Sequence, residues 1–538
     1  MKKFVKTIAL ISSLALLATA FCGCSGDKKE SVSNEDVSLT YWTMMDGTTA
    51  RSLSSYSEML MYQEMEKRTG IHIDFIHPIA GSTGNEAFLT MLSSSELPDL
   101  MEYTWTAYTG GPQAAIDDGM ITALNDYLED YAPNYYDYME GEKGKANDYL
   151  YKLQASTDQG LYYGFNSLCI GNIRGFSGIY ARADKLKEWN MDVPETIDDW
   201  EAVFAKAKAE GFKKPFTSRN DIISFNAQGG QGFNTAFGVG KDLYIEDGKV
   251  VFAPFQKGYK EYVALMADWT KKGYIDTSFI TNNTQDLEGN TTNGISVAAF
   301  GWIGSALGKI MPAMAEKDPN FDLVACPYPV AKKGDKAEFQ EVQPEAAALA
   351  IAVSAESANI EKAVEWCDYI YSDEGSVLRT FGVEGDTYTV VEIDGEKHYQ
   401  YTDKVMKPDP SVAVSATQAL YRFMLPANHP GLNQHPDYLN GYYPYQCQKD
   451  AVNIWNENVE AAKAHFLPTM SYTEDESQER AELLEIAFPE LEAALCDIIL
   501  GKKSIDTYDA AIKKAKDNGY DRVVEITQAA YDRYISKK

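Results

Sequence analysis

Short strand patterns alternate with helix patterns through the hundred residues that follow position 37, and this alternation restricts the possible folds most strongly. The strand patterns cover residues 39–41, 71–75 and 99–103, and the helix patterns between them cover residues 59–65 and 86–94. Residues 71–75 alternate apolar and polar side chains with a period of two, which indicates a strand with one buried face. A strand–helix–strand–helix order predicts an α/β fold, with a parallel sheet covered by helices on both faces.

The length of the chain requires more than one such unit. Just over 500 of the 538 residues follow the N-terminal apolar stretch, which is more than one ordinary domain accommodates. Further strands are expected at residues 161–165, 178–181, 295–300 and 346–353, and the last hundred residues are expected to be largely helical. Thr196 and Asp199 have the spacing of a capping box, and Trp200 and Trp269 lie on apolar helix stripes that predict a core position. We therefore expect two lobes.

The N-terminus has the features of an export signal. Lys2, Lys3 and Lys6 precede an apolar stretch at residues 7–21 that is too short to span a membrane. Gly23-Cys24 then resembles the site at which bacterial lipoproteins are cleaved and acylated, with an ordinary secretory signal as the alternative. We predict a signal peptide at residues 1–23, lipidation of Cys24, and a polar tether at residues 24–37.

The acidity of the chain excludes one class of function. Removal of residues 1–23 takes away three lysines, so the formal charge changes from −30 to −33. Nucleic-acid binding requires a basic surface and is disfavoured. Five cysteines remain beyond Cys24, without metal-like spacing, and we interpret them as buried thiols: Cys169, Cys326, Cys367, Cys447 and Cys496.

No pattern in the sequence indicates catalysis, a cofactor or a metal. Of the six histidines, His429 and His435 lie in a proline-rich loop, where we expect solvated side chains. The glycine-rich segment 228–232 lacks the Lys-Ser/Thr ending of a phosphate-binding loop. Among 79 acidic residues some pairs will have the separation used in glycoside hydrolysis, but that alone does not predict an enzyme.

Tryptophans follow three of the expected strands. Trp42, Trp105 and Trp302 lie where the carboxyl ends of strands would be, the edge at which open parallel sheets bind ligands. A flat aromatic ring can cover the apolar face of a sugar while polar side chains bond its hydroxyls. Each tryptophan can equally pack in a core.

Several segments resemble one known family. Ser95-Glu96-Leu97-Pro98-Asp99-Leu100 resembles the segment before the third strand of the extracellular solute-binding proteins of ABC importers, which include maltose-binding proteins. Ile179-Tyr180-Ala181-Arg182 and Pro194-Glu195-Thr196 resemble that family's strand into the second lobe and the helix start that follows. The segment at residues 121–127 resembles the family's segment after the third strand, and the chain length together with residues 382–388 and 394–396 is similar to its long lipoprotein branch in Gram-positive bacteria.

This resemblance implies a two-lobe receptor that closes around its ligand and delivers it to permease subunits of an ABC transporter. The implied N-lobe comprises residues 38–168 and 345–440, and the implied C-lobe comprises residues 169–344 and 441–538. Crossings between the lobes are expected near residues 165–176, near 343–346, and once more towards the C-terminus. A monomer held at the extracellular face by its lipid is expected, with a carbohydrate ligand and no cofactor.

The family carries no fixed ligand motif, so the candidate ligand residues are chosen by their positions at expected strand ends and crossings. They are Trp42, Asp46, Trp105, Asn166, Arg174, Trp302, Glu345 and Tyr388. The tryptophans and Tyr388 would stack on sugar rings, and the others would bond hydroxyls. Two alternatives remain open at this point: a secreted glycan hydrolase, and a receptor for a non-sugar solute such as a peptide.

Overall fold

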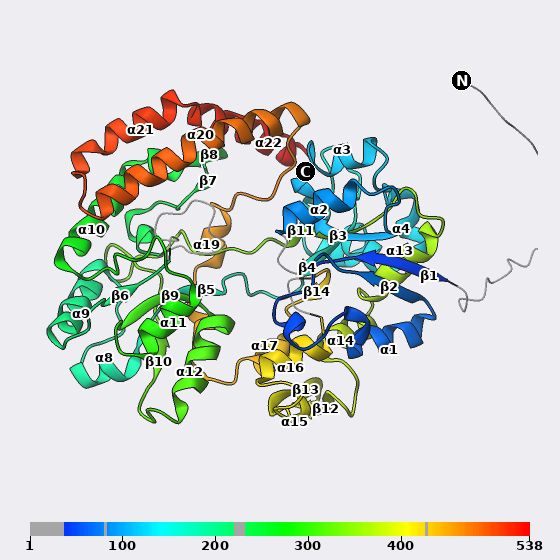
Figure 1. The fold of residues 1–538 in the computed structure, drawn as a ribbon, viewed down its shortest axis with the longest axis horizontal. Coiled ribbons are helices and arrows are strands. Elements are labelled where there is room, and N and C mark those ends of the chain that lie inside the picture. Colours follow the sequence, from blue (N-terminus) through cyan, green and yellow to red (C-terminus); the bar gives the residue numbers. More distant parts are fainter. Residues whose placement is uncertain (1–36, 80–82, 220–231, 426–428, 538) are drawn as a thin grey trace, which may run out of the picture.

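The structure is a computed structural model that describes residues 37–79, 83–219, 232–425 and 429–537. The chain forms two α/β lobes, each built on its own sheet, which lie side by side in Figure 1. We call the lobe that contains the first strands the N-lobe and the other the C-lobe. The expected two-lobe α/β architecture is confirmed. Cys24, the tether up to residue 36 and the glycine-rich residues 228–231 lie outside the described residues.

The N-lobe sheet has six strands. From edge to edge they are β14 (Gly431–Asn433), β4 (Phe165–Cys169), β11 (Ala346–Val353), β3 (Leu100–Thr104), β1 (Ser38–Trp42) and β2 (His72–Ile76). The pairs β1–β2, β1–β3 and β14–β4 are parallel, but β11 is antiparallel to both of its neighbours. The expectation of a parallel sheet is therefore wrong for this strand. The chain leaves the N-lobe after β4 and returns to it through β11, so the direction is reversed.

Helices cover the N-lobe sheet, and a hairpin of β12 (Tyr388–Ile393) and β13 (Glu396–Tyr401) extends from it. The helices are α1 (Leu60–Thr69), α2 (Gly84–Leu92), α3 (Gly111–Asp117), α4 (Asn125–Tyr131), α5 (Pro133–Met139), α6 (Glu142–Ala146), α7 (Leu150–Ala155), α13 (Ile360–Tyr369), α14 (Asp373–Phe381), α15 (Asp403–Met406), α16 (Ala416–Phe423) and α17 (Pro436–Tyr442). α1 ends at Gly70, whose φ of 69° is the left-handed conformation that glycine favours at a helix end.

The C-lobe sheet has the order β10 (Leu323–Ala325), β5 (Ser177–Arg182), β9 (Ala298–Trp302) and β6 (Phe216–Thr217), beside a hairpin of β7 (Leu243–Glu246) and β8 (Lys249–Phe252). Its helices are α8 (Ala183–Trp189), α9 (Ile197–Ala209), α10 (Lys257–Lys272), α11 (Thr284–Thr292), α12 (Gly308–Ala315), α18 (Gln446–Ile454), α19 (Val459–Lys463), α20 (Glu474–Ile499), α21 (Tyr508–Asp517) and α22 (Tyr520–Ser536).

The predicted core of the C-lobe is confirmed. Thr196 and Asp199 form the capping box that begins α9. Trp200 and Trp269 are fully buried, and Phe204 lies between them with ring centroids 5.4 and 5.2 Å away. All five described cysteines are free and buried, as expected.

Two strand predictions were misplaced. Residues 161–164 form no strand, because Tyr162 bonds instead to the start of α4: its N–H donates to Asn125 Oδ1, and its C=O accepts from Leu124 N. The strand expected at residues 295–300 occupies Ala298–Trp302.

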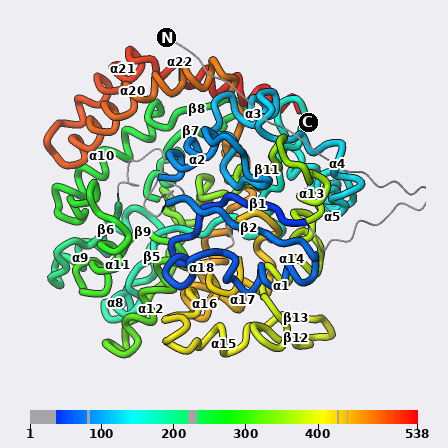
Figure 2. The backbone as a smooth tube through the Cα atoms, turned by 45° about the vertical axis from the view of Figure 1, so that its right-hand side comes forward, coloured from blue at the N-terminus to red at the C-terminus, as the bar shows by residue number. Residues whose placement is uncertain are grey.

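The chain passes between the lobes from β4 to β5, from β10 to β11, and from α17 to α18 (Figure 1). Beyond these passages, the end of α22 lies beside α3 of the N-lobe (Figure 2). Arg533 of α22 bonds Asp158 at 3.0 Å, and Lys537 Nζ donates to Leu153 O and Ser156 O at 3.0 and 2.9 Å. The C-terminal helix is thus a further tie between the lobes.

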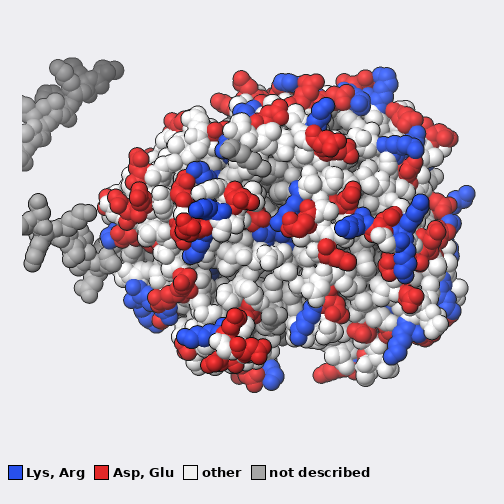
Figure 3. All heavy atoms as spheres, turned by 180° about the vertical axis from the view of Figure 1, so that it is seen from behind, with Lys and Arg blue, Asp and Glu red and all other residues white. Residues whose placement is uncertain are grey.

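Acidic and basic side chains are interspersed over the face seen in Figure 3, so the acidic excess forms no single patch there. No helix in the described part of the chain is long and apolar enough to cross a membrane.

Candidate functional site

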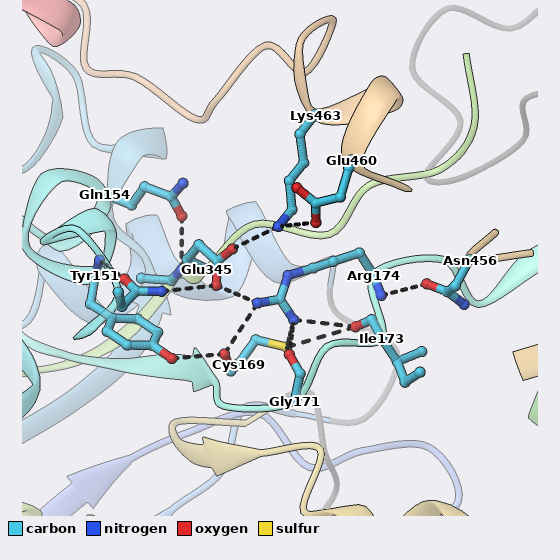
Figure 4. A network of polar contacts seen from close by, with 12 residues as sticks. Tyr151, Gln154, Cys169, Gly171, Ile173, Arg174, Glu345, Asn456, Glu460 and Lys463 are labelled. Carbon is cyan, nitrogen blue, oxygen red and sulfur yellow. Dashed lines mark hydrogen bonds and ion pairs between the residues drawn. The ribbon is translucent and has the colours of Figure 1, made fainter. Parts of the chain in front are cut away.

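Two of the passages between the lobes meet in a buried ion pair (Figure 4). Arg174 lies between β4 and β5, and its Nη2 donates to Oε2 of Glu345, the residue directly before β11. The two side chains are 6 % and 8 % exposed. A buried charge is tolerated only when its partners replace the lost water, so this pair fixes the two passages to each other.

Other groups complete the surroundings of this ion pair. Asn147 Nδ2 donates to Glu345 Oε2 over 3.4 Å, and Lys463 Nζ lies 3.9 Å from Glu345 Oε1. Arg174 Nη1 donates to Cys169 Sγ at 2.6 Å. Burial raises the pKa of the Cys169 thiol to about 12, so the sulfur is a neutral acceptor. The pair is held from both lobes.

A pocket lies at the carboxyl end of β14, beside the passage that carries Arg174. Asn433, the last residue of β14, is paired with Cys169, the last residue of β4. The ends of α14, α16 and α17 complete the wall. The lining residues are Arg379, Thr380, Leu420, Tyr421, Met424, Leu425, Leu432, Asn433, Gln434 and Tyr438. This is the position in an open α/β sheet at which ligands bind.

Two side-chain oxygens of this pocket, Asn433 Oδ1 and Gln434 Oε1, have no hydrogen-bond partner among the described residues. Asn433 is only 6 % exposed, and its amide nitrogen donates to Ser167 Oγ and, at 3.2 Å, to His429 O. These bonds fix the orientation of the amide. A buried acceptor left without a donor costs about 1–3 kcal/mol, so a donor that reached either oxygen would be stabilised.

The guanidinium of Arg379, in the pocket wall, is already hydrogen-bonded within the chain. Arg379 is 2 % exposed and donates to three backbone carbonyls, those of Pro430 (2.8 Å), His429 (2.7 Å) and Leu432 (3.3 Å). Burial lowers the pKa of its guanidinium from the ordinary value. Arg379 therefore supports the β14 backbone.

Tyrosine rings extend the pocket towards the C-lobe. Tyr438 and Tyr442 of α17 stack with centroids 5.2 Å apart and an interplanar angle of 12°. Across the border, Gly304 leaves room for this ring, because a Cβ there would lie 3.3 Å from Tyr442 Oη. Trp302, half-buried at the end of β9, is two residues before Gly304. Tyr442 of the N-lobe thus lies against Gly304 of the C-lobe.

The loop after β1 adds a carboxylate to the same region. Asp46 Oδ1 accepts from Thr48 N at 2.6 Å, and Thr49 Oγ1 donates to Tyr421 O at 3.0 Å, which ties the loop to α16. Burial, then Tyr442 and Asp46, raise the pKa of Tyr421 above its ordinary value. The loop that carries Asp46 is therefore held beside the tyrosine group.

Several of the ligand residues chosen from the sequence lie elsewhere. Trp42 and Trp105 are 4 % and 0 % exposed and pack around Phe88 in the N-lobe core. Asn166 is also buried: its Oδ1 accepts from Tyr135 Oη at 3.0 Å, and its Nδ2 donates to Tyr163 Oη at 3.0 Å. These three side chains are engaged by the N-lobe itself.

The remaining candidates fall into three groups. Arg174 and Glu345 are paired with each other. Tyr388 is 7 % exposed and packs with Phe381 at the base of the β12–β13 hairpin. Asp46 lies on the loop that Thr49 ties to Tyr421, and Trp302 lies two residues before Gly304, which faces Tyr442.

The expectation that His429 is a solvated loop residue is wrong. It is 5 % exposed, and its Nδ1 lies 2.5 Å from Glu102 Oε1 in the N-lobe core. Burial alone would raise the pKa of Glu102, but His429, Tyr41 and Thr43 outweigh it and hold that pKa below its usual value. This pair holds His429 in the N-lobe core.

Sequence reasoning missed Tyr421, Asn433, Gln434, Tyr438 and Tyr442. One signal was available, because Tyr438 and Tyr442 are four residues apart and share a helix face. The two amides follow a three-residue strand that has no clear pattern. In the described residues, no group of three or more His, Cys, Asp or Glu side chains could hold a metal ion.

Comparison with known proteins gives consistent results. Residues 48–377 match the family model for bacterial extracellular solute-binding proteins. A fructooligosaccharide ABC transporter substrate-binding protein, FusA of Streptococcus pneumoniae serotype 4, is 24% identical over 417 residues, 72% of each chain.

Solved structures share the fold. FusA of S. pneumoniae in complex with kestose has a TM-score of 0.71 at 19% identity, over 93% of this chain and 100% of that chain. An HMO-binding solute-binding protein from Bifidobacterium longum infantis has a TM-score of 0.71 at 16% identity, over 93% of this chain and 99% of that chain. The alginate-binding protein AlgQ2 has a TM-score of 0.70 at 18% identity, over 93% of this chain and 99% of that chain.

Proposed function

Because the chain belongs to the family of bacterial extracellular solute-binding proteins, we propose that it captures an oligosaccharide outside the cell and delivers it to an ABC transporter permease. The protein is a receptor in this proposal and leaves its ligand chemically unchanged. Similar proteins are named for fructooligosaccharide, HMO and alginate ligands. Their shared ligand chemistry supports a carbohydrate here.

One observation carries the proposal: the pocket beside the lobe border combines unpaired acceptor oxygens with aromatic rings. Asn433 Oδ1 and Gln434 Oε1 require donors, and sugar hydroxyls supply them. Tyr438, Tyr442 and Trp302 offer flat apolar faces that suit the C–H face of a sugar ring. Among the eight ligand residues chosen from the sequence, we retain Asp46 and Trp302 as the strongest.

The remaining parts of the proposal concern the cell surface. Cys24 is the residue that we propose is lipidated, and residues 24–37 would tether the lobes at the extracellular face of the membrane. Closure of the lobes around the ligand would produce the ligand-bound form that docks on the permease subunits. Cells that express the Cys24→Ala variant should release the protein into the medium.

A thermal-shift screen tests the ligand class. The chain from Ser25 onward is screened against neutral oligosaccharides, uronides, peptides and phosphorylated sugars, and each hit is recovered by chromatography. A ligand at a hundred times its dissociation constant adds about 2.7 kcal/mol to the free energy of unfolding, so the midpoint should rise by a few degrees.

Each outcome has a distinct meaning. An oligosaccharide that raises the midpoint and is recovered intact supports the proposal. Cleavage of that oligosaccharide would favour a glycan hydrolase, and a shift with peptides alone would exclude a carbohydrate ligand.

A further inference from the structure

Two histidines and an aspartate form a cluster at the start of α17, next to the pocket. Asp437 is 7 % exposed; its Oδ1 lies 2.7 Å from Nδ1 of His398 on β13, and its Oδ2 accepts from Tyr399 N at 2.9 Å. On the other side, Asp437 N donates at 3.2 Å to Nδ1 of His435, the residue directly before α17. The cluster therefore holds the start of α17 against the β12–β13 hairpin (Figure 1).

The same segment carries part of the pocket wall. Gln434 and Tyr438 flank the cluster in the sequence, and both line the pocket. Tyr438 N also donates to His435 O at 3.0 Å. Gln434 has a φ of 66°, a left-handed conformation that residues other than glycine seldom adopt and that persists only where the surrounding structure holds it. The positions of the Gln434 amide and the Tyr438 ring therefore depend on how α17 begins.

His398 holds the aspartate most strongly when its ring is charged, because charge-assisted hydrogen bonds are stronger than neutral ones. Its bond to Asp437 raises the pKa of the His398 ring, and the carboxylates of Glu396 and Asp394 at the end of the hairpin add to this. The charge of His398 in turn lowers the pKa of His435. The side chain of His398 is 33 % exposed, so solvent can exchange its proton. Its contribution is complete below the ordinary histidine pKa of about 6.5 and is lost as the pH rises through the raised value.

His435 has the opposite requirement, because only an uncharged ring can accept the N–H of Asp437 at Nδ1. The ring packs against Phe381 of α14 and Tyr399 of β13, with centroids 5.2 and 5.4 Å away. This burial lowers the pKa of His435, although the Asp437 charge opposes it. Arg379, the cation of α14, is bonded to backbone carbonyls. The contribution of His435 is complete above the ordinary pKa and is lost as the pH falls through the lowered value.

On the premise that the proposed function is correct, we propose that His398 and His435 are positioning residues that confine tight sugar binding to a window of pH. Loss of a proton from His398 weakens the bond that holds Asp437, and gain of a proton by His435 removes the bond from Asp437 N. Either change loosens the start of α17, so Gln434 and Tyr438 leave the positions in which they meet a sugar. The two histidines thus set an alkaline limit and an acid limit.

The experiment measures the affinity for a neutral oligosaccharide by calorimetry between pH 5 and pH 9, with the chain from Ser25 onward. Kestose is the first probe, followed by the neutral oligosaccharide that gives the largest shift in the screen. A neutral sugar has no group that titrates in this range, so any dependence on pH belongs to the protein. We expect a bell-shaped profile whose affinity falls about threefold on each side of its maximum, because a charge-assisted bond is lost on one side and a backbone bond on the other.

Two variants remove one limit each. His398→Asn places an amide donor near the position of Nδ1 that cannot lose its proton, so the alkaline limb should disappear. His435→Asn offers an amide oxygen to Asp437 N, as asparagine commonly does before a helix, so the acid limb should disappear. His72→Asn is the matched control, because the bond to Glu66 also raises the pKa of His72, but β2 lies at the opposite edge of the sheet from β14. It should leave both limbs unchanged.

The outcomes distinguish this inference from the proposed function. The unfolding midpoint of each variant is followed over the same pH range, and His398→Gln and His435→Ser replace an asparagine variant that does not fold. An oligosaccharide that binds equally tightly from pH 5 to pH 9 would overturn the inference and leave oligosaccharide capture intact. Two limbs that persist in both histidine variants would also overturn it. If no oligosaccharide binds at any pH, the proposed function fails, and this inference fails with it.

Discussion

The lobe border contains two neighbouring polar regions that differ in one respect. At the passage between the lobes, the Glu345 carboxylate and both terminal nitrogens of Arg174 have partners within the chain. In the pocket at the end of β14, Asn433 Oδ1 and Gln434 Oε1 have none among the described residues. The first region leaves one donor, Arg174 Nε, without a partner among the described residues, whereas the second leaves two acceptors without one.

This difference separates a structural role from a ligand-binding role at the lobe border. Arg174 and Glu345 were chosen as ligand residues because they lie at expected crossings, and their buried ion pair with each other instead favours a structural role. Unpaired acceptors mark the positions where an incoming ligand gains most, because it removes an existing cost. Substitutions in the two regions should therefore act on different quantities, stability in one and affinity in the other.

The largest effect is expected from Glu345→Gln. Removal of one charge from a buried pair leaves Arg174 uncompensated, which costs about 3–5 kcal/mol. Urea unfolding should show this loss in the free energy of unfolding. Glu460→Gln removes the same charge from a side chain that is 82 % exposed and should cost less than about 1 kcal/mol. Equal losses in the two variants would contradict the structural role of the pair.

A smaller and opposite effect is expected from Gln434→Met. The substitution replaces an unpaired buried acceptor with an apolar side chain of similar length, so the free energy of unfolding should stay the same or rise. The affinity for the sugar found in the screen should fall about tenfold, which corresponds to about 1.4 kcal/mol. Calorimetry and urea unfolding on the same samples check both quantities. A loss of stability without a loss of affinity would place Gln434 with the structural group.

The smallest effect concerns the tie between α22 and the N-lobe. Burial lowers the pKa of Lys537 to about 8, although Asp158 opposes this, while the unfolded value is about 10.4. Between pH 8 and 10 the folded state therefore binds fewer protons than the unfolded state, so the free energy of unfolding rises with pH. The contribution of Lys537 to stability is lost as the pH falls through 8. The neutral amine still has two N–H groups for the carbonyls of Leu153 and Ser156.

The difference in unfolding free energy between wild type and Lys537→Gln should therefore grow from pH 8 to 9.5. One proton limits the slope to about 1.4 kcal/mol per pH unit, and partial exposure should keep it below that. A difference that does not change with pH would show that Lys537 stays charged in the folded protein.

Much of the fold was predictable because its signals are local. The capping box at Thr196, the apolar stripe around Trp200 and the strand at Ala346–Val353 each depend on residues close together in the chain. The direction of β11 was not predictable in this way, because it depends on where the chain re-enters the N-lobe. The pocket has the same limitation: Asn433, Tyr421 and Gly304 converge only in three dimensions.

Aromatic position proved a weak guide to exposure. Trp42 and Trp302 end strands and Trp105 directly follows one, yet Trp42 and Trp105 are buried in the N-lobe and Trp302 is half-buried at the border. The difference depends on which neighbouring helices cover each strand end, as α2 does with Phe88.

The position of β11 also bears on how the protein acquires its structure. This strand inserts between β3 and β4, and its Ala350 is paired with Asn166, 184 positions earlier. Until some 350 residues are available, the N-lobe sheet has an empty slot with two unpaired strand edges, which are templates for aggregation. Closing such a long loop also slows folding. If the chain crosses a membrane unfolded, its N-lobe sheet therefore stays incomplete until most of the C-lobe has crossed. During this period a chaperone outside the cell would protect the exposed edges of β3 and β4 from aggregation.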